Sequence, residues 1–144
     1  MRPIYEKTVR AVARCSLSTG VVIACHMESS KTAMLVLDIL EEEGLEGSKL
    51  IFVHAGSEEI LEYHLKAARR GAWIEYDHIS QQTVYRTLKL IKFMVENGFE
   101  NQLLSQDSGW CSIGKARGGT IRGYEYPVKI FLPLMQKRGL IKTS

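Results

Sequence analysis

The sequence predicts an α/β domain in which four parallel strands are each followed by a helix, with one further helix before the first strand. Four short apolar runs alternate with segments whose apolar residues recur at helical spacing. Each run ends in a histidine or an aspartate, and these residues, His26, His54, Asp77 and Asp107, are 28, 23 and 30 positions apart. Each interval is the length of one strand plus one helix, so we expect a parallel sheet with helical crossovers.

The first three elements are a helix, a strand and a second helix. Residues 5–17 carry apolar side chains at helical spacing and are followed by a turn sequence that ends in Gly20. The apolar run at 21–25 predicts the first strand. Residues 32–43 again have one apolar side, and Gly44 ends this helix.

The middle of the chain predicts two more strand and helix pairs. The run at 50–53 is rich in β-branched and aromatic residues, which suits a strand covered on both faces. A helix at 60–70, a strand at 72–76 and a helix at 84–96 follow, and a glycine terminates each helix.

The last strand is expected at 102–106, and a glycine-rich loop at 108–123 follows it. Loops of this length are uncommon and usually functional. The final helix, 124–138, contains Pro127 in its first turn and Pro133 further on, so we expect a break near Leu132.

Composition bounds the class of protein. With 144 residues, 45% of them hydrophobic and 24% charged, the chain is expected to form one globular domain. The net charge of +3 is small and the basic residues are scattered, so we expect no nucleic acid partner. No apolar run approaches 18 residues and no signal region is evident, so we expect a cytoplasmic protein without a membrane partner. Three widely spaced cysteines without a CxxC motif indicate reduced thiols.

Residues with acid, base or ligand chemistry follow all four strands. The carboxyl ends of parallel strands form one rim, where ligands of such sheets bind. His26 and His54 on successive strands, with an aspartate on a third, are the ligand types of zinc or manganese. The sequence therefore predicts a metal site on this rim.

Several residues have a competing interpretation. Asp77 and His78 are adjacent, and strand alternation should allow only one of them to face the interior, without deciding which. Asp107 begins DSG, a turn sequence, and could be a loop cap. His64 is mid-helix, where a surface or packing role is expected. Cys25 should point away from the rim and pack as a small hydrophobe.

The glycine-rich loop offers basic side chains. Lys115, Arg117 and Arg122 could bind an anionic group of a substrate, because the glycines would let the backbone approach closely. A solvated loop is the competing interpretation, and the residues alone slightly favour it.

Taken together, the segments CHMESS, FVHAGSEE, EYDHIS and LLSQDSGW, with GGTIRGYEY and FLPLMQKRGL, resemble the phosphotriesterase-related branch of the amidohydrolase superfamily over essentially the whole chain. The resemblance implies a partial (β/α)8 TIM barrel, strands five to eight, with a two-metal centre. It implies that His26 and His54 bind one metal and that Asp107 binds the other and accepts a proton from the bridging water. It also selects His78 over Asp77, as the partner of Asp107.

The chain departs from the family pattern in three respects. It has no His-x-His pair, and the family's bridging lysine would fall before Met1; Lys7 lies too close to His26 to replace it. Some members have an aspartate three residues after the sixth-strand histidine, where this chain has Ser57.

The resemblance implies a metal-dependent hydrolase of a lactone or ester, using zinc, with manganese or cobalt as alternatives. The lactonase-like last strand end suggests a phosphorylated sugar lactone, with Lys115 or Arg117 at the phosphate and Trp110 in the substrate site. The chain alone should be incomplete, needing the amino-terminal half of the barrel. Its two open strand edges should make it a homo-oligomer or an aggregate in solution. The alternative is a half-barrel that closes with a copy of itself or with a partner chain and binds metal or an anion without catalysis. A flavodoxin-like nucleotide-binding domain fits less well, because no GxGxxG or GxxxxGK[ST] motif is present.

Overall fold

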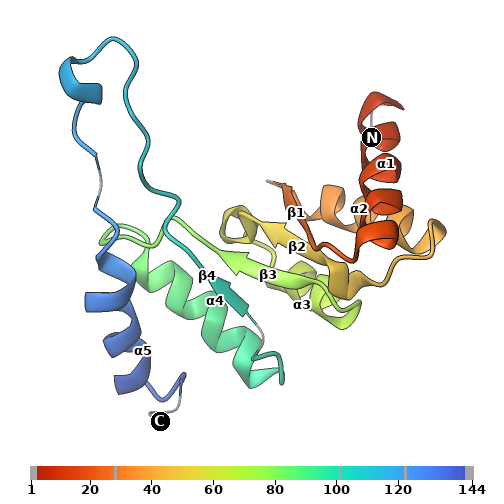
Figure 1. Ribbon diagram of the computed structural model, residues 1–144. Helices are drawn as coiled ribbons and strands as arrows, with labels where there is room; N and C mark the ends of the chain where they lie inside the picture. Colours follow the sequence, from red (N-terminus) through yellow and green to blue (C-terminus); the bar gives the residue numbers. More distant parts are fainter. Residues whose placement is uncertain (1–2, 28, 101, 122, 142–144) are drawn as a thin grey trace.

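The computed structural model describes residues 3–27, 29–100, 102–121 and 123–141, and its elements alternate as expected. The strands are β1 (Ile23–His26), β2 (Leu50–Val53), β3 (Trp73–Tyr76) and β4 (Gln102–Leu104). The helices are α1 (Pro3–Thr19), α2 (Ser30–Glu42), α3 (Leu61–Arg69), α4 (Val84–Glu96) and α5 (Leu132–Lys137). All neighbouring strands pair in parallel, in the order β1-β2-β3-β4, which confirms the predicted α/β architecture (Figure 1).

The helices cover one face of the sheet, and the core lies between them and the strands. On that face Leu50, Phe52 and Ile74 are completely buried. The core is completed by apolar residues of the helices, among them Leu37, Leu40, Leu65, Leu88, Ile91 and Met94. Full burial of one such side chain contributes about 1.5–3 kcal/mol, so these contacts hold the strands in register.

The opposite face of the sheet is only half covered. Ile51 and Val53 on β2 alternate with the buried residues and remain half-buried, as does Trp73, which pairs with Ile51 in register. The expectation that strand 50–53 is covered on both faces is therefore wrong for this chain, because its helices lie on one side only. Within the described ranges, β1 and β4 each have a neighbour on one side, so the sheet has two open edges.

The carboxyl-terminal helix changes type where a break was expected. Residues Pro127–Phe131 (η4) form a π-helical turn in which the N–H of Leu132 bonds to the carbonyl of Pro127, and α5 begins at Leu132. Pro133 has no N–H and its ring displaces a carbonyl of the preceding turn, so the regular ladder cannot run through this point. The predicted break near Leu132 is confirmed.

His64 lies deeper than expected for a surface residue. It is completely buried, its Nε2 lies 3.1 Å from the carbonyl oxygen of Glu58, and its Nδ1 lies 3.0 Å from the hydroxyl of Tyr76. Because a carbonyl only accepts, Nε2 donates and Nδ1 accepts from the hydroxyl. Burial lowers the pKa of His64. Of the two expected roles, packing is the correct one.

Cys25 is half-buried and packs against the core cluster, as predicted. Among the described residues, none of the helices is both long enough and apolar enough to cross a bilayer.

Candidate metal centre

Three strands are each followed, within one to three residues, by a residue with a left-handed backbone. His54 follows β2 with φ 63°, His78 lies two residues after β3 with φ 52°, and Asp107 lies three residues after β4 with φ 44°. Non-glycine residues rarely adopt this conformation, which costs about 1–3 kcal/mol at each position and is concentrated at functional sites. Here it turns the chain at the end of each strand, and the three side chains meet over the rim.

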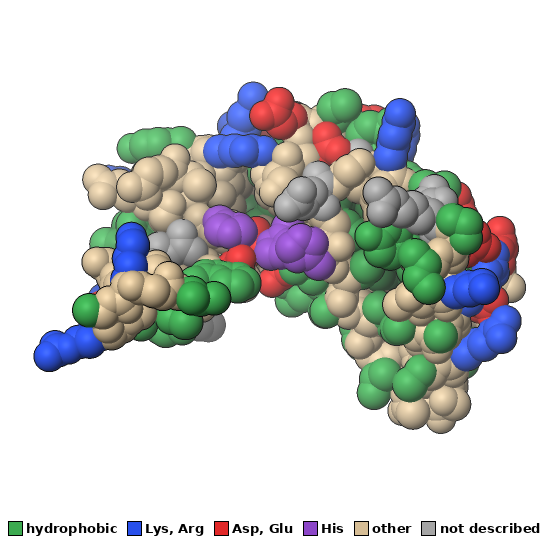
Figure 2. Space-filling view, turned by 90° about the horizontal axis from the view of Figure 1, so that it is seen from above, with side chains coloured by type: hydrophobic (Ala, Val, Ile, Leu, Met, Phe, Trp, Pro, Cys, Tyr) green, Lys and Arg blue, Asp and Glu red, His purple; other side chains and the backbone are tan. Residues whose placement is uncertain are grey.

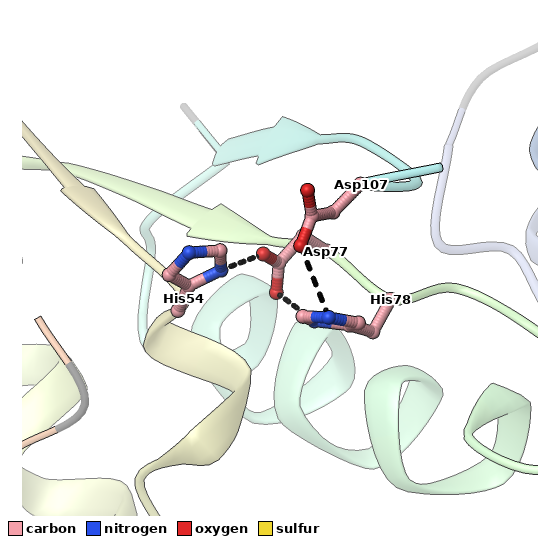
Figure 3. Close-up of side chains that lie close together, drawn as sticks. All are labelled: His54, Asp77, His78 and Asp107. Atoms are coloured by element: carbon pink, nitrogen blue, oxygen red, sulfur yellow. Dashed lines mark hydrogen bonds and ion pairs between the residues drawn. The ribbon is translucent and has the colours of Figure 1, made fainter. Parts of the chain in front are cut away.

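Asp77 is at the centre of this group (Figure 3). Only 5% of the residue is exposed. Its Oδ2 contacts Nδ1 of His54, and its Oδ1 lies 3.2 Å from Nδ1 of His78. One buried carboxylate thus bridges two imidazole rings from successive strand ends.

The outer residues extend the group on both sides. Nε2 of His78 lies 3.0 Å from Oδ2 of Asp107, and Nε2 of His54 lies 2.8 Å from Nδ1 of His26 on β1. Figure 2 shows histidine side chains gathered near the middle of this face of the molecule, with acidic side chains beside them. We call the five residues His26, His54, Asp77, His78 and Asp107 the rim cluster.

Comparison with known proteins fits this arrangement. A sequence model of the phosphotriesterase family matches residues 1–144. The chain belongs to the phosphotriesterase family. The phosphotriesterase homology protein of Escherichia coli is 28% identical over 146 residues, covering 99% of this chain and 49% of that protein. An aryldialkylphosphatase of Saccharolobus solfataricus is 28% identical over 116 residues, covering 75% of this chain and 36% of that protein.

Solved structures of phosphotriesterase-like proteins share the fold. The crystal structure of the E. coli protein has a TM-score of 0.83 at 26% identity and is matched over 96% of this chain and 49% of its own. A lactonase from Listeria monocytogenes has a TM-score of 0.82 at 26% identity, over 96% of this chain and 43% of its own. The chain therefore spans about half the length of these relatives, and its four strands are part of a TIM barrel, as expected.

The donor atoms suit the metal chemistry of a phosphotriesterase-family site. One ligand atom each from His54, Asp77, His78 and Asp107 lie within 4.8 Å of one another. Two nitrogens on a tetrahedral zinc, with bonds of about 2.1 Å, are about 3.4 Å apart. The nitrogens of His26 and His54 would need to separate by only about half an ångström to reach that geometry. Imidazole and carboxylate are the ligands that zinc and manganese take, so the residues present fit such an ion.

Asp77 was counted among the strand-end residues but was set aside in favour of His78, and the structure places both residues in the rim cluster. Strand alternation was expected to leave only one of Asp77 and His78 facing the site, and this is wrong. β3 ends at Tyr76, and the left-handed backbone of His78 brings its ring back to the same side as Asp77. The YDH sequence gave no sign of this, because alternation holds only while the chain stays extended.

Of the expected substrate residues in the loop at 108–123, Trp110 lies beside the rim cluster. The indole Nε1 of Trp110 donates to the carbonyl of Asp107 at 3.0 Å, and Trp110 lines an open hollow of about 310 Å³ together with His78 and Asp107. Lys115 and Arg117 do not line this hollow; they lie at the loop tip, around the short turn η3 (Ala116–Gly118), which projects away from the sheet (Figure 1). Arg122 lies outside the described residues, so the phosphate-binding role of these side chains stays a prediction.

Proposed function

We propose that this chain is the carboxyl-terminal half of a metal-dependent hydrolase that cleaves a lactone or a related ester. The rim cluster carries the proposal, because it joins ligand-type and proton-accepting side chains from four strand ends in one connected group. Relatives named as a lactonase and an aryldialkylphosphatase support hydrolysis as the reaction class.

His26, His54 and Asp107 would hold the metal, with zinc preferred and manganese or cobalt as alternatives. A bound divalent ion lowers the pKa of water and polarises the carbonyl or phosphoryl oxygen of a substrate. Imidazoles and carboxylates at one rim supply the donors that such an ion requires.

Asp107 and His78 would move the proton. The carboxylate of Asp107 accepts it from the attacking water, and His78, whose Nε2 is 3.0 Å from Oδ2 of Asp107, receives it next. Half of the His78 side chain is exposed, so the proton can leave to solvent from there.

A phosphorylated sugar lactone is the proposed substrate. The active site of the E. coli relative holds phosphate in its crystal structure, which supports an anionic group near such a site. In this chain Trp110 would contact the substrate beside Asp107, and bending of the loop would bring Lys115 or Arg117 to the phosphate. Lys115→Ala or Arg117→Ala should then raise KM for a phosphorylated lactone far more than for its dephosphorylated form. Equal changes for both substrates would refute this assignment.

Turnover is expected to need the amino-terminal half of a barrel, because among the described residues the inner face of the sheet is only half covered and neither edge strand has a second neighbour. The test is lactone hydrolysis by this chain mixed with the amino-terminal half of a family relative. Asp107→Asn should abolish activity in the mixture, whereas Asp38→Asn on the outer surface of α2 should not. Activity that survives Asp107→Asn would contradict the proposal.

The same open edges favour a second candidate, a half-barrel that pairs with its own copy and binds metal or an anion without turnover. Unpaired strand edges are templates for association. A dimer by light scattering, with no hydrolysis even beside a complementing half, would support this candidate. A monomer in solution would refute it.

A further inference from the structure

We propose that His64 is a positioning residue that ties the turn beginning with His54 to the strand end beside Asp77. Its consequence for catalysis rests on the proposed function. The tie itself rests on the contacts of His64, a buried residue that lies outside the rim cluster and that the proposed reaction does not use.

On one side, the His64 ring holds the turn that follows β2. The short helix η2 (Ala55–Ser57) begins directly after His54, and the N–H of Ser57 donates to the carbonyl of His54 at 3.0 Å. The next carbonyl along the chain, that of Glu58, accepts from Nε2 of His64 at 3.1 Å. His64 therefore holds the far end of the turn that carries His54.

On the other side, the His64 ring holds the end of β3. Its Nδ1 accepts from the hydroxyl of Tyr76 at 3.0 Å, and the two rings stack with their centroids 5.6 Å apart and their planes 27° apart. Tyr76 is the last residue of β3, so Asp77 follows it directly. Both rings are completely buried, so water does not compete for these contacts.

The two strand ends need such support because each contains a left-handed residue. His54 has φ 63° and His78 has φ 52°. This backbone conformation is strained and persists only where the surrounding structure holds it. His64 bonds to Glu58, four residues after the first of these positions, and to Tyr76, two residues before the second.

The helix that carries His64 is anchored at the same point. α3 begins at Leu61, and the N–H of Ile60, the residue before it, donates to Oε1 of Glu58 at 2.9 Å. Leu65, next to His64, is buried in the core. The ring therefore has a fixed base, and a change in its shape or polarity reaches both strand ends.

On the proposed function, this tie sets the metal site. His54 belongs to the proposed ligand set, and Asp77 contacts its ring. If the two strand ends separate, their donor atoms no longer converge on one ion. His64 thus acts on the metal only through His54 and Asp77.

Hydrogen exchange in the turn tests the tie in the intact chain without a metal. His64→Leu removes both hydrogen bonds, whereas His64→Gln keeps a donor and an acceptor on one side chain. Protection of the Ser57 amide should fall about 10-fold in His64→Leu, as expected when buried polar groups lose their partner, and stay within about threefold of the wild type in His64→Gln. Equal protection in His64→Leu and the wild type would overturn the inference, as would an equal loss in both variants.

A second amide separates a local effect from a loss of overall stability. The N–H of Leu45, just after α2, bonds to the carbonyl of Leu40 at 2.8 Å. In His64→Leu its protection should change less than that of Ser57, because the opening is local. An equal loss at both amides would mean that His64 only stabilises the fold as a whole, and would refute the positioning role. Glu62→Gln, at an exposed position of the same helix, is the matched control and should leave both amides unchanged.

Co²⁺ binding distinguishes this inference from the proposed function, because the visible absorption of this ion depends on the geometry of its ligands. In His64→Leu the spectrum should change and the Co²⁺ affinity should fall about 10-fold, and His64→Gln should restore both. If Co²⁺ binds and His64→Leu changes neither property, the inference fails while the metal site stands. If the wild type binds no Co²⁺ but the amides respond as expected, the metal site fails while the tie stands.

Discussion

The hydroxyl of Tyr76 is expected to stabilise the strand end that carries Asp77 and His78. It donates to Nδ1 of His64 at 3.0 Å, and both residues are completely buried. Tyr76→Phe keeps the ring and leaves this nitrogen without a donor in a dry site. A buried polar atom without a partner costs about 1–3 kcal/mol.

For a chain of this length, 1 kcal/mol corresponds to about 2–4 °C in Tm, so Tyr76→Phe should lower Tm by roughly 2–12 °C. Thermal unfolding followed by circular dichroism measures the change. It is best done near pH 8, because burial lowers the pKa of His64 and the unfolded chain therefore binds a proton more readily. Stability should accordingly decline as the pH falls below the ordinary histidine value of 6.5, which would obscure the effect of the hydroxyl.

Tyr85→Phe is the matched control, because Tyr85 is 71% exposed on α4. Changes at exposed positions usually stay within about 0.5 kcal/mol. The reasoning would be refuted if Tyr76→Phe lowered Tm no more than Tyr85→Phe.

Two further predictions follow from ionisable groups outside the rim. Hydrogen bonds from Arg14 and Arg10 on α1 lower the pKa of Glu43, beside α2, to about 2. The stability that these bonds contribute is therefore fully present above the ordinary carboxyl pKa of 4.5 and is lost as the pH falls toward 2. In denaturant titrations, Glu43→Gln should thus lower the free energy of unfolding at pH 7 but not at pH 2. An equal decrease at both pH values would contradict this prediction. Burial raises the pKa of the Cys25 thiol. At pH 8 Cys25 should therefore react with a disulfide reagent more slowly than the exposed Cys111. Equal reaction rates for the two thiols would contradict this prediction.

Local patterns were enough to predict most of the fold. The strand Leu50–Val53 and the helix Val84–Glu96 have the expected bounds, since apolar spacing and flanking glycines mark both. The last strand, Gln102–Leu104, is shorter than the expected 102–106, and beyond it Gln106 bonds the carbonyl of Gly123 through its Nε2 at 2.6 Å. That contact joins the two ends of the long loop, and no local pattern encodes it.

The rim cluster was predictable only in part. His26, His54, Asp77, His78 and Asp107 were all expected at one rim from their places after the strands, but the choice of His78 over Asp77 came from the family resemblance. The inclusion of Asp77 depends on a left-handed residue after β3, which overrides strand alternation. The burial of His64 depends on its contact with Tyr76, twelve residues away on another element.

The central claim is that His26 and His54 form part of a metal site, and metal content tests it most directly. Mass spectrometry of the purified chain after equilibration with zinc should find about one ion per chain. The His26→Ala/His54→Ala double variant should bind none and retain its circular dichroism spectrum. No bound ion in either protein, or equal amounts in both, would contradict the claim.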